Sequence, residues 1–546
     1  MIFLSFPNDA LRNLITKGPK YREQNKIAWG KDKKMIMTAV ENYAKKWASR
    51  DHFDVSVLDD WINEIKHIIM TRIRKLQKIT RQPPNPVLND PEVAACLRDM
   101  HNKYVFAPAD KASNNVIVIC KKYYLKVLCD ELGLFTNTGS STYKKVTDSL
   151  HTILDKHQQF LSSFDLKFSD VHNNLPHIYA LPKLHKNPYK FRFIAGSKFC
   201  STKDLSVLLS KGLKKVQEFW FNYCGQIDAT SGVNRFWILS NSKNMLEQLN
   251  GANDKLPYEQ VSSWDFSTLY TTIPHSDLKK CIKSLVYKTF QKNNFKKMVV
   301  SFTGAYFCDD VKDGQLAIEY DQFVELLNFL IDNIYVNFGD SIFRQTVGIP
   351  MGTNCAPLLA NLYLFYHEYA FLERLPRDKK FHGKHFKLTF RFIDDLLSIN
   401  NGYFREYISQ IYPGNLELKE TTESDMECSF LDVMMYNDNG EIKFKLYDKR
   451  DDFQFNIVNY PHLDSNIPLG PAYGVYVSRL IAFARVCTDF KHFDSRHSTL
   501  FLKLVDQGYS KIKLKRTFLK FIEKHESLLR KYQKDLRCYI NDVVNI

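Results

Sequence analysis

The sequence feature that most constrains this chain is a pair of adjacent acids, Asp394 and Asp395, inside an apolar run. The run reads FRFIDDLLSI over residues 390–399, and its two flanks predict short β-strands. Adjacent carboxylates within hydrophobic strands repel each other and lose hydration, so the pair persists only where something offsets that cost. Two explanations fit: a bound cation neutralises the charges, or the acids lie in water at the tip of a hairpin.

A second apolar stretch, SWDFSTLY over residues 263–270, carries one further acid, Asp265, and is followed by helix-compatible residues after Pro274. One acid at a strand end plus an acid doublet matches two-metal phosphoryl transfer. That chemistry uses two Mg²⁺ ions, about 3.5–4 Å apart, with oxygen ligands from at least two chain segments. Asp265, Asp394 and Asp395 are therefore the candidate catalytic and metal-binding residues, with Mn²⁺ as an alternative ion.

Between these acids, residues 346–361 read TVGIPMGTNCAPLLAN. Two glycines and two prolines predict a tight loop that opens a helix. A position without a side chain, such as Gly352, lets a base or a sugar approach the backbone closely. A structural loop that only starts a helix is the plainer alternative for this segment.

The charge of the chain favours a polyanionic partner. Seventy-six basic and 60 acidic residues give a net charge of +16, which indicates nucleic acid rather than a membrane. The longest apolar candidate for a membrane span, residues 358–372, is interrupted by Asn361, His367 and Glu368. Eleven cysteines without a C-x-x-C pair are typical of reduced thiols in an intracellular protein. The apolar start ends at Pro7, so we expect no secretory leader.

The order and content of these motifs resemble the palm of a reverse transcriptase. The details are most similar to Penelope-like retroelements, which are distant relatives of telomerase. The resemblance covers roughly residues 105–530 and implies an RNA-directed DNA polymerase, a nucleotidyltransferase of a retrotransposon that binds RNA and DNA. The segments that carry it are PADKASNNVIVI (108–119), LPKLHKNPYKFRFIAGS (181–197), GIPMGTNCAPLLAN (348–361), FIDD (392–395) and CSFLDVMMY (428–436).

The resemblance also implies roles for single residues. Asp265 and Asp394 would bind the metal ions, with Asp395 as a third ligand or as a supporting residue. Tyr270 would be a steric gate whose ring clashes with a ribose 2′-hydroxyl, which favours deoxynucleotides. The remaining implied roles are Arg192 and Lys183 as cations that grip the triphosphate, Gly352 as a lining residue of the template–primer groove, and Lys419 as the candidate general acid that protonates pyrophosphate.

The chain departs from the better-known members of this class at a few positions. Phe392 stands where retroviral enzymes have Tyr, and Met351 stands where many have Gln; both fit the Penelope-like pattern. Arg192 is followed by Phe193 instead of Pro. Many Penelope-like proteins also carry a GIY-YIG nuclease domain. We expect none in this chain, because residues 474–476, GVY, lack the partner motif.

We expect an α+β fold of the right-hand polymerase type. The hairpin turn signal Asn439-Gly440 predicts two strands over 430–436 and 441–447, and helical periodicity returns in the last hundred residues. The expected division is a helical basic N-terminal extension over 1–105, fingers over 106–260, a palm with an antiparallel sheet over 261–430, and a post-palm hairpin with a helical thumb over 431–546.

The expected partners are an RNA template, a DNA primer and dNTPs, with no membrane, and the function implies a nuclear location. One alternative is a catalytically inactive or domesticated nucleic-acid-binding protein that retains the polymerase fold; the three intact acids argue against it. Another is an RNA polymerase that copies RNA, against which Tyr270 argues. The sequence leaves open the natural template, the priming site, the integration target, a nuclease acting in trans and the oligomeric state.

Overall fold

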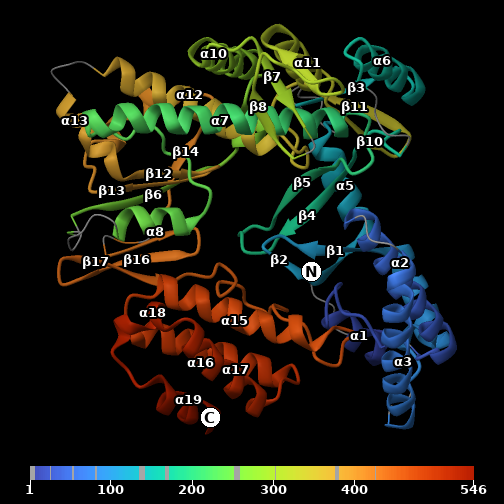
Figure 1. Cartoon of the computed structure of the whole chain (residues 1–546). Helices are drawn as coiled ribbons and strands as arrows, with labels where there is room; N and C mark the ends of the chain where they lie inside the picture. Colours follow the sequence, from blue (N-terminus) through green and yellow to red (C-terminus); the bar gives the residue numbers. More distant parts are fainter. Residues whose placement is uncertain are drawn as a thin grey trace.

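A computed structural model describes the chain from residue 6 to residue 545, except for residues 25, 52–54, 80–82, 135–141, 167–170, 251–256, 258, 302, 376–379, 423 and 425. The elements form stacked layers (Figure 1), in which a central sheet separates a helical layer from a hairpin and a C-terminal group of helices. This layered order determines which side chains of the central sheet reach the site described below.

The central sheet has four antiparallel strands in the order β12-β13-β6-β14. Along the chain its elements follow as strand, helices, two strands, helix and strand, which is the split β-α-β arrangement of a polymerase palm. The elements of this region are α7 (Lys203–Ser231), α8 (Ser242–Asn250), β6 (Val261–Phe266), α9 (Leu269–Thr272), α10 (His275–Asn293), α11 (Tyr320–Asp332), α12 (Ala356–Arg374), α13 (Lys380–His385), η3 (Phe386–Leu388), β12 (Thr389–Phe392), β13 (Asp395–Ile399), α14 (Phe404–Ile411) and β14 (Leu418–Glu420).

Both faces of the palm sheet are buried, by different layers. Trp264 and Leu396 belong to the core that includes α7, α10, α12 and α14. Leu397 and Ile399 belong to a second core shared with the hairpin and the C-terminal helices. Because side chains alternate along a strand, the odd-numbered positions of β13 all face the C-terminal side. Asp395 therefore shares that face.

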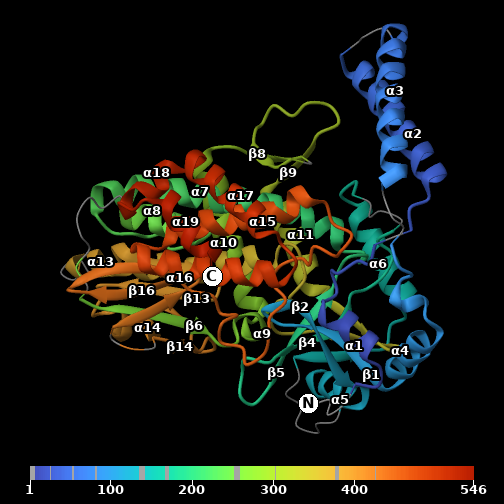
Figure 2. The ribbon, with the colours of Figure 1, turned by 90° about the horizontal axis from the view of Figure 1, so that it is seen from below.

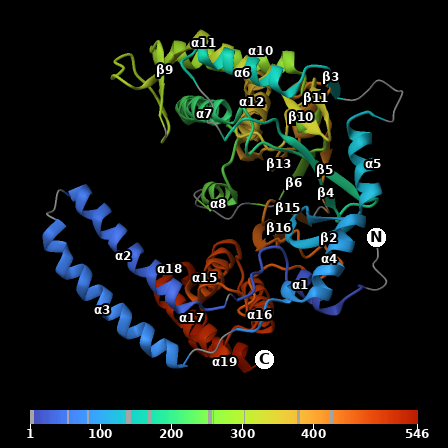
Figure 3. The same ribbon diagram turned by 90° about the vertical axis from the view of Figure 1, so that its right-hand side faces the viewer.

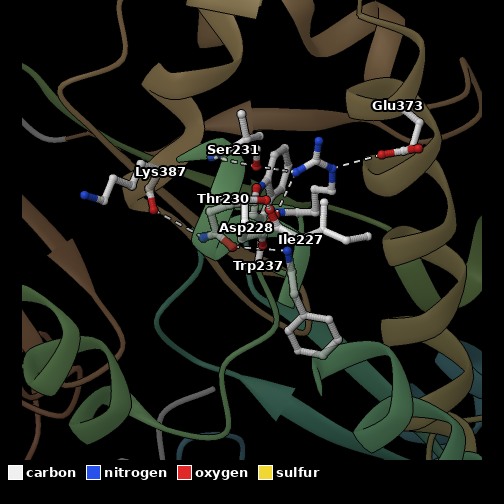
Figure 4. A network of polar contacts seen from close by, with 11 residues as sticks. Ile227, Asp228, Thr230, Ser231, Trp237, Glu373 and Lys387 are labelled. Carbon is white, nitrogen blue, oxygen red and sulfur yellow. Dashed lines mark hydrogen bonds and ion pairs between the residues drawn. The ribbon is translucent and has the colours of Figure 1, made fainter. Parts of the chain in front are cut away.

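The outer strand of the palm sheet, β12, is covered by the extended segment that follows α7. The backbone N–H of Arg391 donates to the carbonyl of Trp237 at 2.7 Å. Figure 4 shows the polar network around this segment, in which the Arg235 guanidinium binds Asp228 at 2.8 Å and Glu373 at 2.9 Å. The network fixes the segment against β12, so this strand does not present a free edge to another chain.

The fingers contain a five-stranded sheet built from distant parts of the chain, with strand order β3-β11-β10-β4-β5. A two-stranded ladder, β1-β2, lies beside it, and a small three-stranded sheet, β8-β7-β9, projects from the helical layer. The strands, with the two helices among them, are β1 (Tyr104–Ala109), β2 (Ala112–Cys120), α5 (Lys121–Glu131), β3 (Tyr143–Val146), α6 (Leu150–Ser162), β4 (His177–Lys183), β5 (Lys190–Gly196), β7 (Lys297–Val300), β8 (Ala305–Phe307), β9 (Leu316–Glu319), β10 (Tyr335–Phe338) and β11 (Ser341–Gln345).

The predicted hairpin after the palm is confirmed. Asn439 and Gly440 have φ angles of 53° and 82°, and two consecutive positive φ angles are what a type I′ turn requires. The predicted C-terminal helices form the thumb, which packs on this hairpin. The elements that follow β14 are β15 (Glu427–Phe430), β16 (Val433–Asp438), β17 (Glu441–Leu446), α15 (Leu469–Val486), α16 (Phe490–Asp506), α17 (Lys511–Lys524), α18 (Glu526–Leu529), η4 (Arg530–Tyr532) and α19 (Leu536–Asn545).

The N-terminal part is helical. Two long helices, α2 and α3, pack along each other and project from the body of the protein, as Figures 2 and 3 show from two directions. The first helix, α1, instead packs on α4 and β2 through a small core around Leu11 and Met100. The elements are α1 (Asp9–Thr16), α2 (Trp29–Asp51), α3 (Val55–Ile79), η1 (Val87–Asn89) and α4 (Pro91–Lys103).

The fold is thus α+β with the right-hand architecture that the sequence predicts: fingers, a palm on an antiparallel sheet, and a helical thumb. The residue boundaries of the four predicted regions stay predictions. Within the described residues, no helix combines the length and the apolar character that a membrane crossing requires.

Buried histidines should make folding sensitive to acid. Burial lowers the pKa of His497 to about 3 and the pKa values of His157 and His367 to about 4. In the unfolded chain these rings take up a proton near pH 6.5. The unfolded state therefore binds more protons below that pH, and the free energy of unfolding should fall as pH decreases from about 6.5 towards 4.

His497→Gln tests this directly. The two ring nitrogens of His497 hydrogen-bond the hydroxyls of Tyr476 (2.6 Å) and Tyr539 (2.7 Å), so the variant should be less stable than the wild type at pH 7.5. It should nevertheless lose less further stability on acidification, because one titrating group is gone. Urea unfolding at a series of pH values measures both effects; an unchanged pH dependence would show that His497 does not contribute.

Candidate active site

The structure brings the three predicted acids together at one end of the palm sheet. Asp265 on β6 and Asp395 at the start of β13 are direct partners in the antiparallel ladder, so their side chains leave the same face. Asp394 precedes Asp395 in the turn, and the carbonyl of Asp394 accepts a hydrogen bond from the N–H of Phe266 at 3.1 Å. The main chain of the doublet is thus tied to the strand that carries the third acid.

The hairpin that carries the doublet has a two-residue turn, Ile393-Asp394, between β12 and β13. Ile393 has a φ of +55°. A β-branched residue in the left-handed region is a genuine outlier, and such strain costs on the order of 1–3 kcal/mol. It persists only where the surroundings hold the backbone, and it gathers at functional sites. The sequence left two explanations open for the doublet, a bound cation or a hairpin tip. The backbone places the doublet at a hairpin tip.

A fully buried ion pair holds this turn from below. Arg391 on β12 and Glu368 on α12 both have 0% exposed side chains, and the guanidinium donates to both carboxylate oxygens, at 2.5 and 3.1 Å. The same guanidinium donates to the Asn361 side chain at 2.8 Å and to the carbonyl of Ile393 at 3.1 Å. The Tyr412 hydroxyl adds a hydrogen bond to Glu368 at 2.8 Å.

Sequence reasoning missed this ion pair, although a signal was present. Asn361 and Glu368 are polar interruptions of an apolar helix, and Arg391 is the one charge in the apolar strand before the doublet. Polar groups at such positions must find partners when buried. Arg391 satisfies both interruptions, and its bidentate contact with Glu368 lies directly under the hairpin turn.

Burial and neighbouring carboxylates destabilise the charged forms of Asp265 and Asp395. Burial, and then the charge of Asp394, raises the pKa of Asp265. Burial also raises the pKa of Asp395 to about 6, with the charges of Asp394 and Asp265 adding to the increase. Carboxylates that face each other with raised pKa values are a site at which a cation gains energy by neutralising negative charge.

Lysines from three regions of the chain face these acids. Lys449 in the segment after β17 is the strongest cation acting on both Asp265 and Asp395 and lowers the pKa of each. Lys183 and Lys186 act on Asp265, and Lys111 acts on Asp395. Lys449 was not among the predicted site residues, because its mixed-charge surroundings, YDKRDD, are equally typical of a surface turn.

Tyr270 lies on the short helix α9, directly after the strand of Asp265. Its side chain is largely buried, and burial together with the charge of Asp394 raises its pKa to about 12. The carbonyl of Tyr270 accepts a hydrogen bond from the N–H of Ile349 at 2.7 Å, and a Cβ on Gly348 would lie 2.5 Å from the same carbonyl. The predicted tight loop therefore packs on the backbone of α9, and Gly348 has a φ of +87°.

Gly352 connects this loop to the fingers. Its φ is +122°, and a Cβ there would lie 2.1 Å from the carbonyl oxygen of Ala195 on β5. The N–H of Ala195 donates to the carbonyl of Met351 at 2.8 Å. Contact between two backbones thus explains the glycine without a ligand. Gly352 is exposed, and its predicted role in lining a template–primer groove stays a prediction.

The two predicted fingers cations lie close to one another. Arg192 on β5 binds Asp110 at 3.4 Å, and its buried Nε has no hydrogen-bond partner among the described residues. Lys183 on β4 is half-buried, and its pKa is lowered by burial and by the charge of Arg192. Asp110 is itself buried, with one carboxylate oxygen unpartnered among the described residues. Within the described residues, Arg192 therefore retains an unsatisfied donor beside Lys183.

Lys419 lies beside the acids in the sheet, but its amine pairs with another side chain. It is opposite Asp265 in the β6–β14 ladder, so Asp395, Asp265 and Lys419 form one row across three strands. The amine of Lys419, however, binds Glu417 at 3.1 Å, and its side chain is 58% exposed. The role of this lysine as a general acid stays a prediction.

The donor set fits a hard divalent cation, with one restriction. Carboxylate oxygens are the ligands that Mg²⁺ and Mn²⁺ take in proteins, and here they are half-buried and mutually repulsive. Among the described residues, however, no three His, Cys, Asp or Glu side chains converge closely enough to hold a metal ion. Asp265, Asp394 and Asp395 lie at the same end of the palm sheet, but their side chains do not enclose a common point in this conformation.

Comparison with known proteins gives weak similarities. No family profile and no curated protein matches the chain. Telomerase from Candida albicans, solved in complex with a TWJ fragment of telomeric RNA, is similar over 85% of this chain and 76% of that chain, at 10% identity and a TM-score of 0.48. Apo telomerase from Candida tropicalis is similar over 86% of this chain and 76% of that chain, at 12% identity and a TM-score of 0.43.

A third structure is the insertion-loop deletion mutant of the RNA-dependent RNA polymerase of a human picobirnavirus. It is similar over 99% of this chain and 96% of that chain, at 11% identity and a TM-score of 0.35. The right-hand polymerase fold is assigned here from the palm topology and not from these similarities. The structure thus combines a right-hand polymerase fold with three acids at one end of the palm sheet.

Breaking the buried ion pair should destabilise the palm far more than breaking an exposed pair. Glu368→Gln leaves the buried Arg391 charge without a counter-charge and should lower the free energy of unfolding by about 3–5 kcal/mol. The matched control is Glu420→Gln, which removes the partner of Arg405, a side chain that is 67% exposed; exposed pairs contribute at most about 1 kcal/mol. Urea unfolding compares the two, and equal losses would contradict the assignment.

Proposed function

We propose that this protein is an RNA-directed DNA polymerase of a retroelement, which extends the 3′-hydroxyl of a primer with dNTPs on an RNA template. The observation that carries the proposal is the paired register of Asp265 and Asp395 beside Asp394 at a strained, internally braced hairpin turn. Paired carboxylates at such a turn, flanked by lysines, suit a reaction in which a polyanion reacts at a divalent cation.

The chain would contribute positioning and charge. Asp265, Asp394 and Asp395 would hold Mg²⁺ ions, which supply activation of the primer hydroxyl and neutralisation of the triphosphate charge. Arg192 and Lys183 would bind the phosphates from the fingers side, where the Arg192 Nε is buried without a partner among the described residues. Lys449 would stabilise negative charge from the thumb side of the acids.

The chain would select deoxynucleotides through Tyr270. Its helix begins three residues after β6 ends, and its ring lies within electrostatic range of Asp394. A side chain held there by burial, and by the loop that packs on its backbone, would occupy the space of a ribose 2′-hydroxyl. The RNA template, the DNA primer and the nuclear location remain parts of the proposal that follow from the sequence resemblance.

Asp394→Asn should abolish primer extension while leaving nucleic-acid binding intact. Loss of one carboxylate should lower the extension rate by a factor of about 10²–10³ or more, since catalytic charge stabilisation is removed. Removing a negative charge should not weaken attraction to a polyanion. Extension of oligo(dT) on poly(rA) measures the first effect and fluorescence anisotropy measures the second.

Asp313→Asn is the matched control, because Asp313 is exposed in the loop between β8 and β9. It should extend primers like the wild type. A wild-type protein that binds poly(rA)–oligo(dT) but adds no nucleotide would favour the binding-only alternative. An Asp394→Asn variant that extends normally would show that the acids are not catalytic.

Tyr270→Val should reduce the preference for dNTPs over rNTPs, because the smaller side chain no longer meets the 2′-hydroxyl. The ratio of extension efficiencies with dTTP and UTP measures the preference, and we expect it to fall by about tenfold or more, the scale of one specific packing contact. Tyr306→Val, at an exposed position on β8, is the control. An unchanged ratio in Tyr270→Val would remove the gate assignment.

A further inference from the structure

A large cavity lies between the fingers and the segment that leads into the thumb. Its volume is about 1200 Å³, above the roughly 300–1,000 Å³ of ordinary ligand sites. The cavity is lined by α1, by the middle of β2, by the loop between β4 and β5, and by residues 452–458 after β17. None of the residues assigned a role in the proposed reaction, apart from neighbouring Lys186, lines it.

The walls of this cavity are fixed to each other. The Asn115 side chain on β2 accepts the N–H of Val458 at 3.0 Å and donates to the carbonyl of Asn456 at 2.9 Å. On the other side, Arg22 after α1 donates its N–H to the Ser465 hydroxyl at 3.0 Å. Fingers, N-terminal helix and thumb segment are therefore bonded around the space, which is part of the fold and not a loose gap.

The lining combines aromatic rings with cations. Phe453 contacts His185 and Phe455 edge to face, with ring centroids 5.8 and 5.1 Å apart. Phe455 and Tyr189 are exposed, with 36% and 59% of their surfaces accessible. The two exposed cations of the lining are Arg12 on α1 and Lys186 between β4 and β5.

Two polar atoms in the lining lack partners. The Nδ1 of His185 and the Oε1 of Gln507 are buried and make no hydrogen bond with any described residue. Buried polar atoms are normally satisfied, so each of them points to a group that is present in the working state. Together these two atoms can hydrogen-bond a flat, polar ligand that lies between the aromatic rings.

One residue, Lys186, relates the cavity to the acids. Lys186 lines it, and the charge of the same Lys186 lowers the pKa of Asp265. A strand that leaves the catalytic turn on this side would pass from Lys186 to the aromatic rings. Stacking faces next to cations are the general means of binding unpaired nucleotides, because every base has a π-face and every nucleotide a phosphate.

We propose that this cavity binds unpaired nucleotides of a single-stranded nucleic acid that extends beyond the duplex at the catalytic acids. The proposal rests on the proposed polymerase function for the identity of the strand, which is then the template ahead of copying. Phe455 and Tyr189 stack on bases, Arg12 and Lys186 bind phosphates, and His185 and Gln507 supply hydrogen bonds to base edges.

The test compares two RNA–DNA duplexes in anisotropy measurements with the full chain: one with a short single-stranded 5′ extension of the RNA and one with blunt ends. Phe455→Ala and Tyr189→Ala should each weaken binding of the extended duplex about five- to a hundredfold, the range that removal of a stacking aromatic produces. Binding of the blunt duplex should not change. Phe221→Ala, on an exposed position of α7 outside the cavity, should affect neither duplex.

Two results would overturn the proposal: equal loss of affinity for both duplexes, which would place the rings against the duplex, or unchanged binding of the extended duplex in both variants. Circular dichroism confirms that the variants fold. Binding does not require nucleotide addition. A wild-type chain that prefers the extended duplex but fails to extend any primer would therefore retain the cavity assignment and refute the polymerase function.

Discussion

The site depends on one buried interaction, the contact of Arg391 with Glu368 beneath the hairpin turn. A charged pair with no exposed surface is costly to desolvate, and its own stability contribution is often small or negative compared with apolar residues of similar size. Its value here is geometric. The guanidinium is planar and donates in fixed directions, so satisfying Glu368 and Asn361 leaves one donor directed at the carbonyl of Ile393.

That remaining hydrogen bond links the core of the palm to the strained residue of the turn. Without it, Ile393 would gain by leaving the left-handed region, and the doublet would rotate relative to β6. The position of the turn thus depends on a contact one layer below the acids, which includes Glu368 of helix α12.

Parts of this site were predictable from sequence because they are local. The acid doublet within apolar strands, the acid of β6 and the Asn439-Gly440 turn each depend on neighbours in the chain, and each forms the predicted local structure. The contribution of Lys449 depends on how the segment after β17 folds back over the palm, and no local pattern distinguishes it from a solvated lysine. Lys419 is a different case. The sequence places it near the acids, but its amine binds Glu417, and only the side-chain geometry determines that choice.

Because the cations and the acids come from separate regions, charge balance couples the parts of the molecule. Lys111 and Lys186 belong to the fingers and Lys449 follows the hairpin, yet all act on acids of the palm. Burial, and then the neighbouring carboxylates, keeps the pKa values of Asp265 and Asp395 raised despite these lysines. Any process that brings a cation to the acids releases the lysines to face an incoming polyanion. If the proposed function holds, binding of a cation and binding of a polyanion should therefore reinforce each other.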